Sequence, residues 1–318
     1  MSITTAHGCS LLTAFVAVGC YGAPPADGEV AAALAPAALL AAHQIQPANI
    51  AVDSSYVYFI DAGDAADRGS IRRVSKRGGA VTVLASGESE PGSLAVDGST
   101  LYWSANTPDG VGAIRAVAKR GGTAYSMAGN LQGAFALASD DYNLYFATRG
   151  LIMRLSKFGG VPIALAAARC VNASVVDVSS VYWVENCVIT PPAGIFTVSK
   201  LFGGLALPVS SDAPGALAVD ASNLYWVDNG LTRSQPKGGG PPRLLYDTHN
   251  YGAVVASDAS NLYLTVDRSI LRLAKAGGAP TPVWTGDFVP NGAAVDGGRI
   301  YFDGGPFGDA VVEVVGTH

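Results

Sequence analysis

The sequence is poor in charge, in histidine and in long apolar runs. Only 14% of its 318 residues are charged, against about 25% in an ordinary soluble domain. The formal net charge is −5, which excludes the basic footprint of a nucleic-acid-binding protein. No segment approaches the 18 consecutive apolar residues of a membrane-spanning helix. Four histidines leave little material for acid–base pairs or a His-rich zinc site.

Glycine, proline and hydrophobic residues are what the chain has in abundance. It contains 39 glycines and 18 prolines, and 49% of its residues are hydrophobic. So much hydrophobic material excludes a disordered acidic chain, and the glycines and prolines disfavour long helices. We therefore expect short strands joined by tight turns.

The N-terminal segment differs from the rest. Leu11–Val18 is an eight-residue apolar run, too short to cross a bilayer and typical of a signal peptide. Ala17–Cys20 resembles a bacterial lipobox, in which the cysteine is lipidated, although no Lys or Arg precedes the run. We predict a signal peptide over residues 1–20, a lipidation site at Cys20 and a flexible linker over residues 21–36. An uncleaved apolar tail is the alternative.

Internal repeats dominate the remainder of the chain. An aspartate followed five residues later by a tyrosine occurs seven times, at Asp53, Asp97, Asp140, Asp177, Asp220, Asp258 and Asp296. A lysine followed closely by Gly-Gly occurs six times, at Lys76, Lys119, Lys157, Lys200, Lys237 and Lys275. These are the only lysines in the sequence. A unit of 37–44 residues that recurs in this way indicates a repeat architecture.

Each unit predicts four short antiparallel strands. The first ends at the aspartate, whose carboxylate can cap a tight turn, and the second contains the tyrosine. The third ends at the lysine, where Gly-Gly supplies the positive φ that a hairpin loop requires. The prediction is an all-β, seven-bladed β-propeller over residues 37–318.

The last unit lacks its fourth strand, and a segment near the start can supply it. Ala37–Gln44 has the same spacing to Asp53 as the fourth strands of other units have to theirs. We predict that it pairs with Val311–Val315 and closes the ring, leaving no open sheet edge. A helical linker is the alternative, because the segment is rich in alanine.

Two of the four cysteines are predicted to form a disulfide. If the Asp177–Ser180 turn has two central residues and no bulge, residues pair when their numbers sum to 357, as Cys170 and Cys187 do. Directly opposed positions have Cα atoms about 4.5 Å apart, which permits a bridge. An exported chain would favour oxidation. Two free thiols are the alternative.

The second strands carry a family resemblance. Leu224–Asp228 (LYWVD) and Leu101–Trp103 (LYW) resemble the YWTD and NHL-like repeats of β-propellers, and the lysine hairpins resemble those of secreted bacterial, TolB-like propellers. The resemblance covers residues 37–318 and implies the propeller fold. YWTD propellers have six blades, so a six-bladed ring is the alternative. Such propellers have many functions, so the resemblance implies no single activity.

The two faces of the ring have different predicted roles. On the lysine face, which carries the aspartate turns and the lysine hairpins, we expect each aspartate to cap its own turn and each lysine to be solvated. A carboxylate ring for a cation and a lysine ring for an anionic partner are the alternatives. The opposite face, the loop face, carries all three insertions, and variable loops on a regular scaffold usually hold the binding site. The candidate binding residues there are Asp61, Asn106, Arg149, Glu185, Asp228, His249, Asp267 and Asp303.

The sequence favours a non-catalytic function. We expect an exported monomer, extracellular or lipid-anchored in the cell envelope, that binds a protein or small-molecule ligand or acts as a scaffold. No cofactor and no nucleic-acid partner are expected, and membrane contact only through the N-terminal lipid. The alternative is a metal-assisted hydrolase or lyase in the central channel, using a divalent cation such as calcium.

Overall fold

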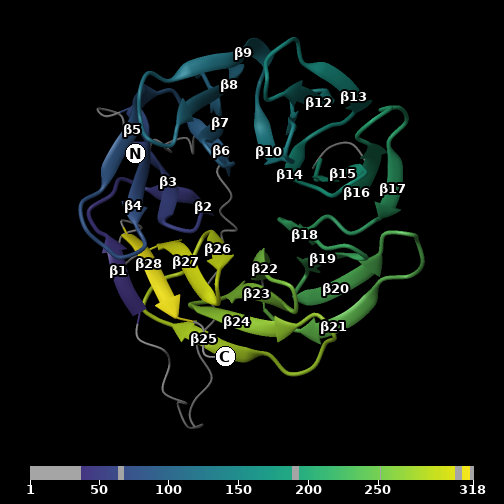
Figure 1. Ribbon diagram of the computed structural model, residues 1–318. Coiled ribbons are helices and arrows are strands. Elements are labelled where there is room, and N and C mark those ends of the chain that lie inside the picture. Colours follow the sequence, from purple (N-terminus) through teal and green to yellow (C-terminus); the bar gives the residue numbers. More distant parts are fainter. Residues whose placement is uncertain (1–36, 64–67, 188–192, 251, 305–309, 316–318) are drawn as a thin grey trace, which may run out of the picture.

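The chain forms a ring of seven four-stranded antiparallel sheets (Figure 1). The computed structural model describes residues 37–63, 68–187, 193–250, 252–304 and 310–315. The seven-bladed propeller is therefore confirmed, and the six-bladed alternative is wrong. The predicted signal peptide, linker and Cys20 lie outside the described residues. Within the described part, no helix is long and apolar enough to cross a membrane.

The strands follow the sequence units, one unit to a blade. Blade 1 consists of β2 (Pro47–Val52), β3 (Tyr56–Gly63), β4 (Arg68–Ser75) and β5 (Thr82–Glu88). Blade 2 consists of β6 (Pro91–Val96), β7 (Thr100–Asn106), β8 (Val111–Ala118) and β9 (Tyr125–Gln132). Blade 3 consists of β10 (Phe135–Ser139), β11 (Asn143–Ala147), β12 (Leu151–Ser156) and β13 (Ile163–Ala167).

The remaining blades repeat the same order. Blade 4 consists of β14 (Val171–Val176), β15 (Ser180–Glu185), β16 (Gly194–Ser199) and β17 (Leu207–Ser210). Blade 5 consists of β18 (Leu217–Val219), β19 (Asn223–Asp228), β20 (Leu231–Pro236) and β21 (Arg243–Asp247). Blade 6 consists of β22 (Gly252–Ser257), β23 (Asn261–Val266), β24 (Ser269–Ala274) and β25 (Thr281–Thr285). Blade 7 combines β26 (Ala293–Asp296), β27 (Arg299–Gly304) and β28 (Ala310–Val315) with β1 (Ala37–Ala41).

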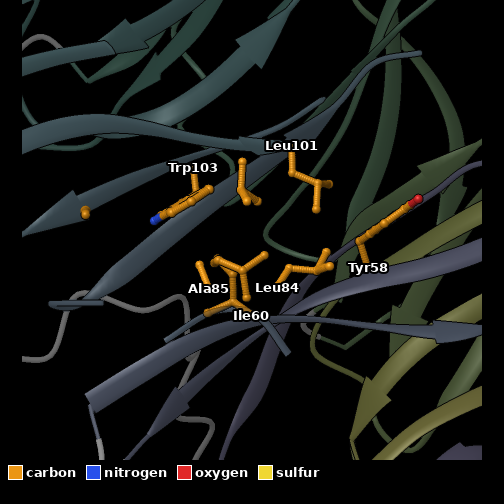
Figure 2. Close-up of a cluster of buried hydrophobic side chains, with 9 residues drawn as sticks. Tyr58, Ile60, Leu84, Ala85, Leu101 and Trp103 are labelled. Atoms are coloured by element: carbon orange, nitrogen blue, oxygen red, sulfur yellow. The ribbon is translucent and has the colours of Figure 1, made fainter. Parts of the chain in front are cut away.

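The core lies between neighbouring blades. Tyr58 and Ile60 of β3 pack against Leu101 and Trp103 of β7, and all four side chains are buried (Figure 2). Second strands such as β7 are buried on both faces, because a blade is covered on each side by its neighbours. This explains why the apolar runs in these strands do not alternate with polar residues.

The N-terminal strand closes the ring. β1 pairs antiparallel with β28, with Ala37 opposite Val314 and Leu39 opposite Val312, which confirms the predicted closure and excludes the helical linker. The strand ends at Ala41, three residues earlier than predicted. His43 already has a φ of 56°, which is incompatible with a continued strand.

A disulfide joins Cys170 to Cys187, as predicted. Their Cα atoms are 5.3 Å apart, farther than the simple hairpin geometry predicts. The predicted register holds at Ala173 and Val184, but a bulge follows and places Val171 opposite Glu185. The assumption of a bulge-free hairpin is therefore wrong, although the cysteines still meet.

Candidate functional site

The repeated aspartates cap their own turns. In blade 1, Asp53 Oδ1 accepts hydrogen bonds from the backbone N–H groups of Ser55 and Tyr56, both at 2.8 Å. Asp53 Oδ2 accepts a hydrogen bond from the Tyr58 hydroxyl, also at 2.8 Å. The same arrangement recurs at Asp97, Asp140, Asp177, Asp220 and Asp258. The predicted capping role is confirmed for these six blades.

The six lysines bind the aspartates of the preceding blade. The pairs are Lys76–Asp296, Lys119–Asp53, Lys157–Asp97, Lys200–Asp140, Lys237–Asp177 and Lys275–Asp220. The lysine side chains are only 5–18% exposed, so the prediction of solvated hairpin lysines is wrong. Five of these ammonium groups also lie over the tyrosine ring of the preceding blade. The alternatives were a cation-binding carboxylate ring and an anion-binding lysine ring. In both cases the charged groups are already paired with each other between blades.

The pairing changes the titration of the aspartates. Burial alone would raise the pKa of Asp53, but hydrogen bonds from Lys119 and from backbone N–H groups outweigh it and lower the pKa to about 2. The same balance lowers the pKa of Asp140 and of Asp177 to about 2. These carboxylates are therefore held ionised, and their role is to connect blades.

The joint between blades 6 and 7 differs from the others. The sequence has no lysine after Lys275, and Asp258 instead accepts hydrogen bonds from Asn261 Nδ2, at 3.2 Å, and from the Tyr263 hydroxyl, at 2.7 Å. In blade 7, the Tyr301 hydroxyl donates to Glu313 at 3.2 Å rather than to an aspartate. Blade 7 thus meets blade 6 without the lysine pair.

Two of the predicted binding carboxylates have structural partners. Asp61 is buried and accepts hydrogen bonds from the Ile45 and Gly63 N–H groups at 2.9 and 3.1 Å, and Arg72 Nη1 lies 3.0 Å away. Glu185 is buried and accepts a hydrogen bond from the Trp183 indole at 3.0 Å.

Asp303, a third predicted residue, is a buried carboxyl group with an incomplete set of partners. Its Oδ1 accepts a hydrogen bond from the Gly292 N–H at 2.5 Å, while Oδ2 is buried without a hydrogen-bond partner. Burial raises the pKa of Asp303 to about 7. A carboxyl that is protonated through the acid range fits this environment, because the charged form would be desolvated.

Three further candidates lie at the end of a second strand or just after it. The Asn106 side chain binds both backbone groups of Ala134 at 2.8 and 2.9 Å, which ties blade 2 to blade 3. Arg149 is exposed, and its guanidinium lies against Gly110. Burial and the neighbouring Asp212 raise the pKa of Asp228.

His249 and Asp267 lie on adjoining loops of blades 5 and 6. The His249 side chain is 82% exposed, and its Nδ1 lies 2.8 Å from Asp247. The next residue, Asn250, donates from Nδ2 to Asp267 Oδ2 at 3.0 Å. The structure therefore joins these two candidates through Asn250.

A cavity of about 340 Å³ occupies the axis of the ring. Four first strands, β10, β14, β18 and β22, line it with aliphatic side chains and three serines. The lining residues are Ala138, Ser139, Ser174, Val175, Val176, Leu217, Ala218, Val219, Val254, Val255, Ala256 and Ser257. The sequence shows the small residues two places before each aspartate, but it does not show that four of the first strands line a cavity.

The described residues offer no metal centre. Among them, no group of three or more His, Cys, Asp or Glu side chains is placed to hold a metal ion. Calcium typically takes six to eight oxygen ligands, and the repeated carboxylates are engaged by lysines and backbone N–H groups.

Comparison with known proteins supports the fold. Neither a protein-family model nor a curated protein matches the sequence. The structure is similar to YCF48 bound to a D1 peptide, with 10% identity, a TM-score of 0.64, and coverage of 91% of this chain and 99% of that one. It is also similar to a chain of the nidogen/laminin complex, with 18% identity, a TM-score of 0.53, and coverage of 70% and 89%.

A third similar structure is the extracellular domain of a putative hybrid two-component system from B. thetaiotaomicron. The identity is 10% and the TM-score 0.65, and the match covers 88% of this chain and 39% of that one. This chain therefore spans about two fifths of that protein. At these identities the likenesses show a shared β-propeller fold and leave the function to be argued from the site.

Proposed function

We propose that this chain is an exported propeller that binds a ligand or protein partner and does not catalyse a reaction. The observation that carries the proposal is the axial cavity, whose volume of about 340 Å³ lies within the usual range of ligand sites. Its aliphatic walls and serine hydroxyls suit a small, largely apolar ligand with a few hydrogen-bonding groups. None of the residues that line it is an acid or a base.

The loop face provides a second contact surface in this proposal. Arg149, His249 and Asp267 are exposed there and can bind a polar partner, whereas Asp61, Glu185 and Asp303 are buried and support the loops from within. YCF48, one of the similar structures, is bound to a peptide, which supports a peptide as one class of partner.

Export is supported by two observations. The Cys170–Cys187 disulfide is typical of oxidising compartments, and extracellular domains are among the similar structures. We further propose that Cys20 carries a lipid anchor. Mass spectrometry of the membrane fraction should find a lipid-modified Cys20, and a Cys20→Ala chain should be released into the soluble fraction.

The cavity is tested by filling it. Ala256 lines the cavity, so Ala256→Phe should remove the part of the binding of 1-anilinonaphthalene-8-sulfonate, an apolar fluorescent probe, that belongs to the cavity, measured by titration. Ala276→Phe, on an exposed hairpin of the same blade, is the matched control and should bind the probe like the natural chain. Equal binding by both variants would contradict the proposed site.

A thermal-shift measurement tests the absence of catalysis through a metal. The melting temperature should be the same with calcium, with magnesium and with EDTA. A rise of several degrees with either cation would favour the metal-assisted hydrolase or lyase instead.

A further inference from the structure

The lysine face carries large apolar side chains on two neighbouring hairpins. Blades 1 and 2 place Arg77 and Arg120 directly after the hairpin lysine, and blades 5 and 6 place Gly or Ala there. Blade 3 instead places Phe158 there, and blade 4 places Leu201 followed by Phe202. The two phenylalanine side chains are 85% and 86% exposed. Exposed aromatic side chains at hairpin tips cost solubility and mark a contact surface when they gather in one place.

Exposed apolar side chains of blades 2 to 4 lie on neighbouring parts of this face. A groove of about 240 Å³ lies between Tyr125 on β9 and Phe158. The hairpin of blade 4 rests on blade 3, because the Gly204 N–H donates to the Leu165 carbonyl at 2.8 Å. We call this surface the apolar rim; its exposed residues are Tyr125, Phe158, Val161, Leu201, Phe202 and Leu205.

Two exposed arginines lie on the hairpins that precede the apolar rim. Lys157 and Lys200, beside the rim, are paired with aspartates of the preceding blades. Arg77 and Arg120 are exposed on the adjacent hairpins of the same face. Guanidinium groups bind phosphate oxygens strongly, so apolar tips beside arginines match the apolar and anionic layers of a phospholipid surface.

The chain also enters the ring on this face. Ala37, the first residue of β1, pairs with Val314 near the end of β28. That end lies beside the aspartate turn of blade 7, because Arg299 pairs with Val315. The described chain therefore begins on the face that carries the apolar rim, and an N-terminal anchor would draw this face toward a membrane.

We propose that the lysine face rests on an anionic lipid bilayer, with the apolar rim inserted among the headgroups and with Arg77 and Arg120 bound to lipid phosphates. This goes beyond the proposed ligand binding, which uses a different surface, and does not depend on it. A second copy of the chain fits less well. Six apolar residues and two arginines fall far short of the roughly 20–30 residues per side of a stable protein interface.

A tryptophan placed on the rim reports its depth in the bilayer. The four natural tryptophans are buried, so Phe202→Trp adds an exposed one. With the full chain on vesicles of phosphatidylcholine and phosphatidylglycerol bearing brominated acyl chains, the added fluorescence should be quenched about twofold or more. Val289→Trp, at an exposed position between β25 and β26 on the loop face, should not be quenched. An unquenched Phe202→Trp, or equal quenching of both variants, would overturn the proposal.

Vesicle co-sedimentation tests the side chains themselves. Phe158→Ser combined with Phe202→Ser should weaken binding about tenfold, because two apolar side chains no longer insert. Leu39→Ser with Leu244→Ser removes two exposed apolar side chains elsewhere and should leave binding unchanged. Replacing Arg77 and Arg120 by Gln should weaken binding only when phosphatidylglycerol is present.

The same variants distinguish a membrane from a second copy. In sedimentation velocity without lipid, the natural chain and the Phe158→Ser, Phe202→Ser variant should both be monomers. A dimer of the natural chain that the two substitutions dissociate, together with unchanged vesicle binding, would assign the apolar rim to self-association and refute the bilayer.

Discussion

Asp303 shows how one buried side chain couples this fold to pH. Its pKa of about 7 lies far above the ordinary value of 3.8, because burial disfavours the charged form. Between these values the folded chain binds a proton that the unfolded chain has released. The free energy of unfolding must therefore fall as the pH rises from about 4 to about 7.

Replacing Asp303 by Asn should remove that dependence. The Asn side-chain oxygen can still accept the Gly292 hydrogen bond, but the group no longer titrates. The free energy of unfolding of Asp303→Asn relative to the natural chain should increase by up to about 4 kcal/mol between about pH 4 and pH 8. Urea unfolding across this range measures it.

The control for this prediction is the same substitution at an exposed aspartate. Asp267→Asn removes one negative charge at an exposed position and should show little change in relative stability over the same pH range. If Asp303→Asn and Asp267→Asn behave alike, Asp303 ionises normally in the folded chain.

At the scale of the strand, β1 is a short element on which the closure of the ring depends. It supplies the fourth strand of blade 7 and covers β28. Leu40 is 7% exposed and packs in one cluster with Val57 and Phe59 of blade 1. Its neighbour Leu39 is 61% exposed and lies opposite Val312, whereas Leu40 lies at an irregularity in the register.

Leu40→Ala should destabilise the ring more than Leu39→Ala. Loss of a buried leucine side chain costs about 2–5 kcal/mol, whereas an exposed one costs about 0.5 kcal/mol or less. Chemical denaturation of both variants measures the difference. Equal losses would mean that β1 contributes pairing alone and that its packing against blade 1 is unimportant.

The strands were predictable from the sequence because each unit contains its own turn signals. The spacing of Asp53 and Tyr58 fixes a hairpin inside one blade, and the missing fourth strand pointed to β1. The lysine pairs were not predictable in the same way. Lys119 lies in one unit and binds Asp53 of another, and a repeat does not show which neighbour a long side chain reaches.

The candidate site was less predictable than the fold. Asp61 and Asp267 both stand at or just beyond the end of a second strand, yet one is buried beside Arg72 and the other is exposed. Burial depends on how neighbouring blades and bulges approach, which no single unit encodes. The axial cavity is likewise a property of the ring, because four blades must converge to line it.

At the scale of the molecule, inter-blade lysine–aspartate pairs hold the ring at every joint but one. Six joints carry such a pair, and the joint between blades 6 and 7 does not. In the described part of the chain, each blade packs mainly against its two neighbours, so these pairs act together on the stability of the closed ring.

The whole ring should therefore lose stability in acid. Hydrogen bonds lower the pKa of Asp53, Asp140, Asp177 and Asp220 to about 2 against burial, which acts in the opposite direction. A lowered folded-state pKa contributes stability that is complete above the unfolded value of about 4 and is lost as the pH falls toward about 2. Urea unfolding should show the free energy of unfolding falling steeply below about pH 4.

Lys237→Met identifies the pairs as the cause. Without the lysine, the pKa of Asp177 should rise, so this variant should be less stable near neutral pH but should lose less stability between about pH 5 and pH 2. Arg268→Met removes a cation that makes no inter-blade pair with an aspartate turn and should keep the acid dependence of the natural chain. An acid transition that is the same in both variants would show that the lysine pairs do not set the acid limit of the ring.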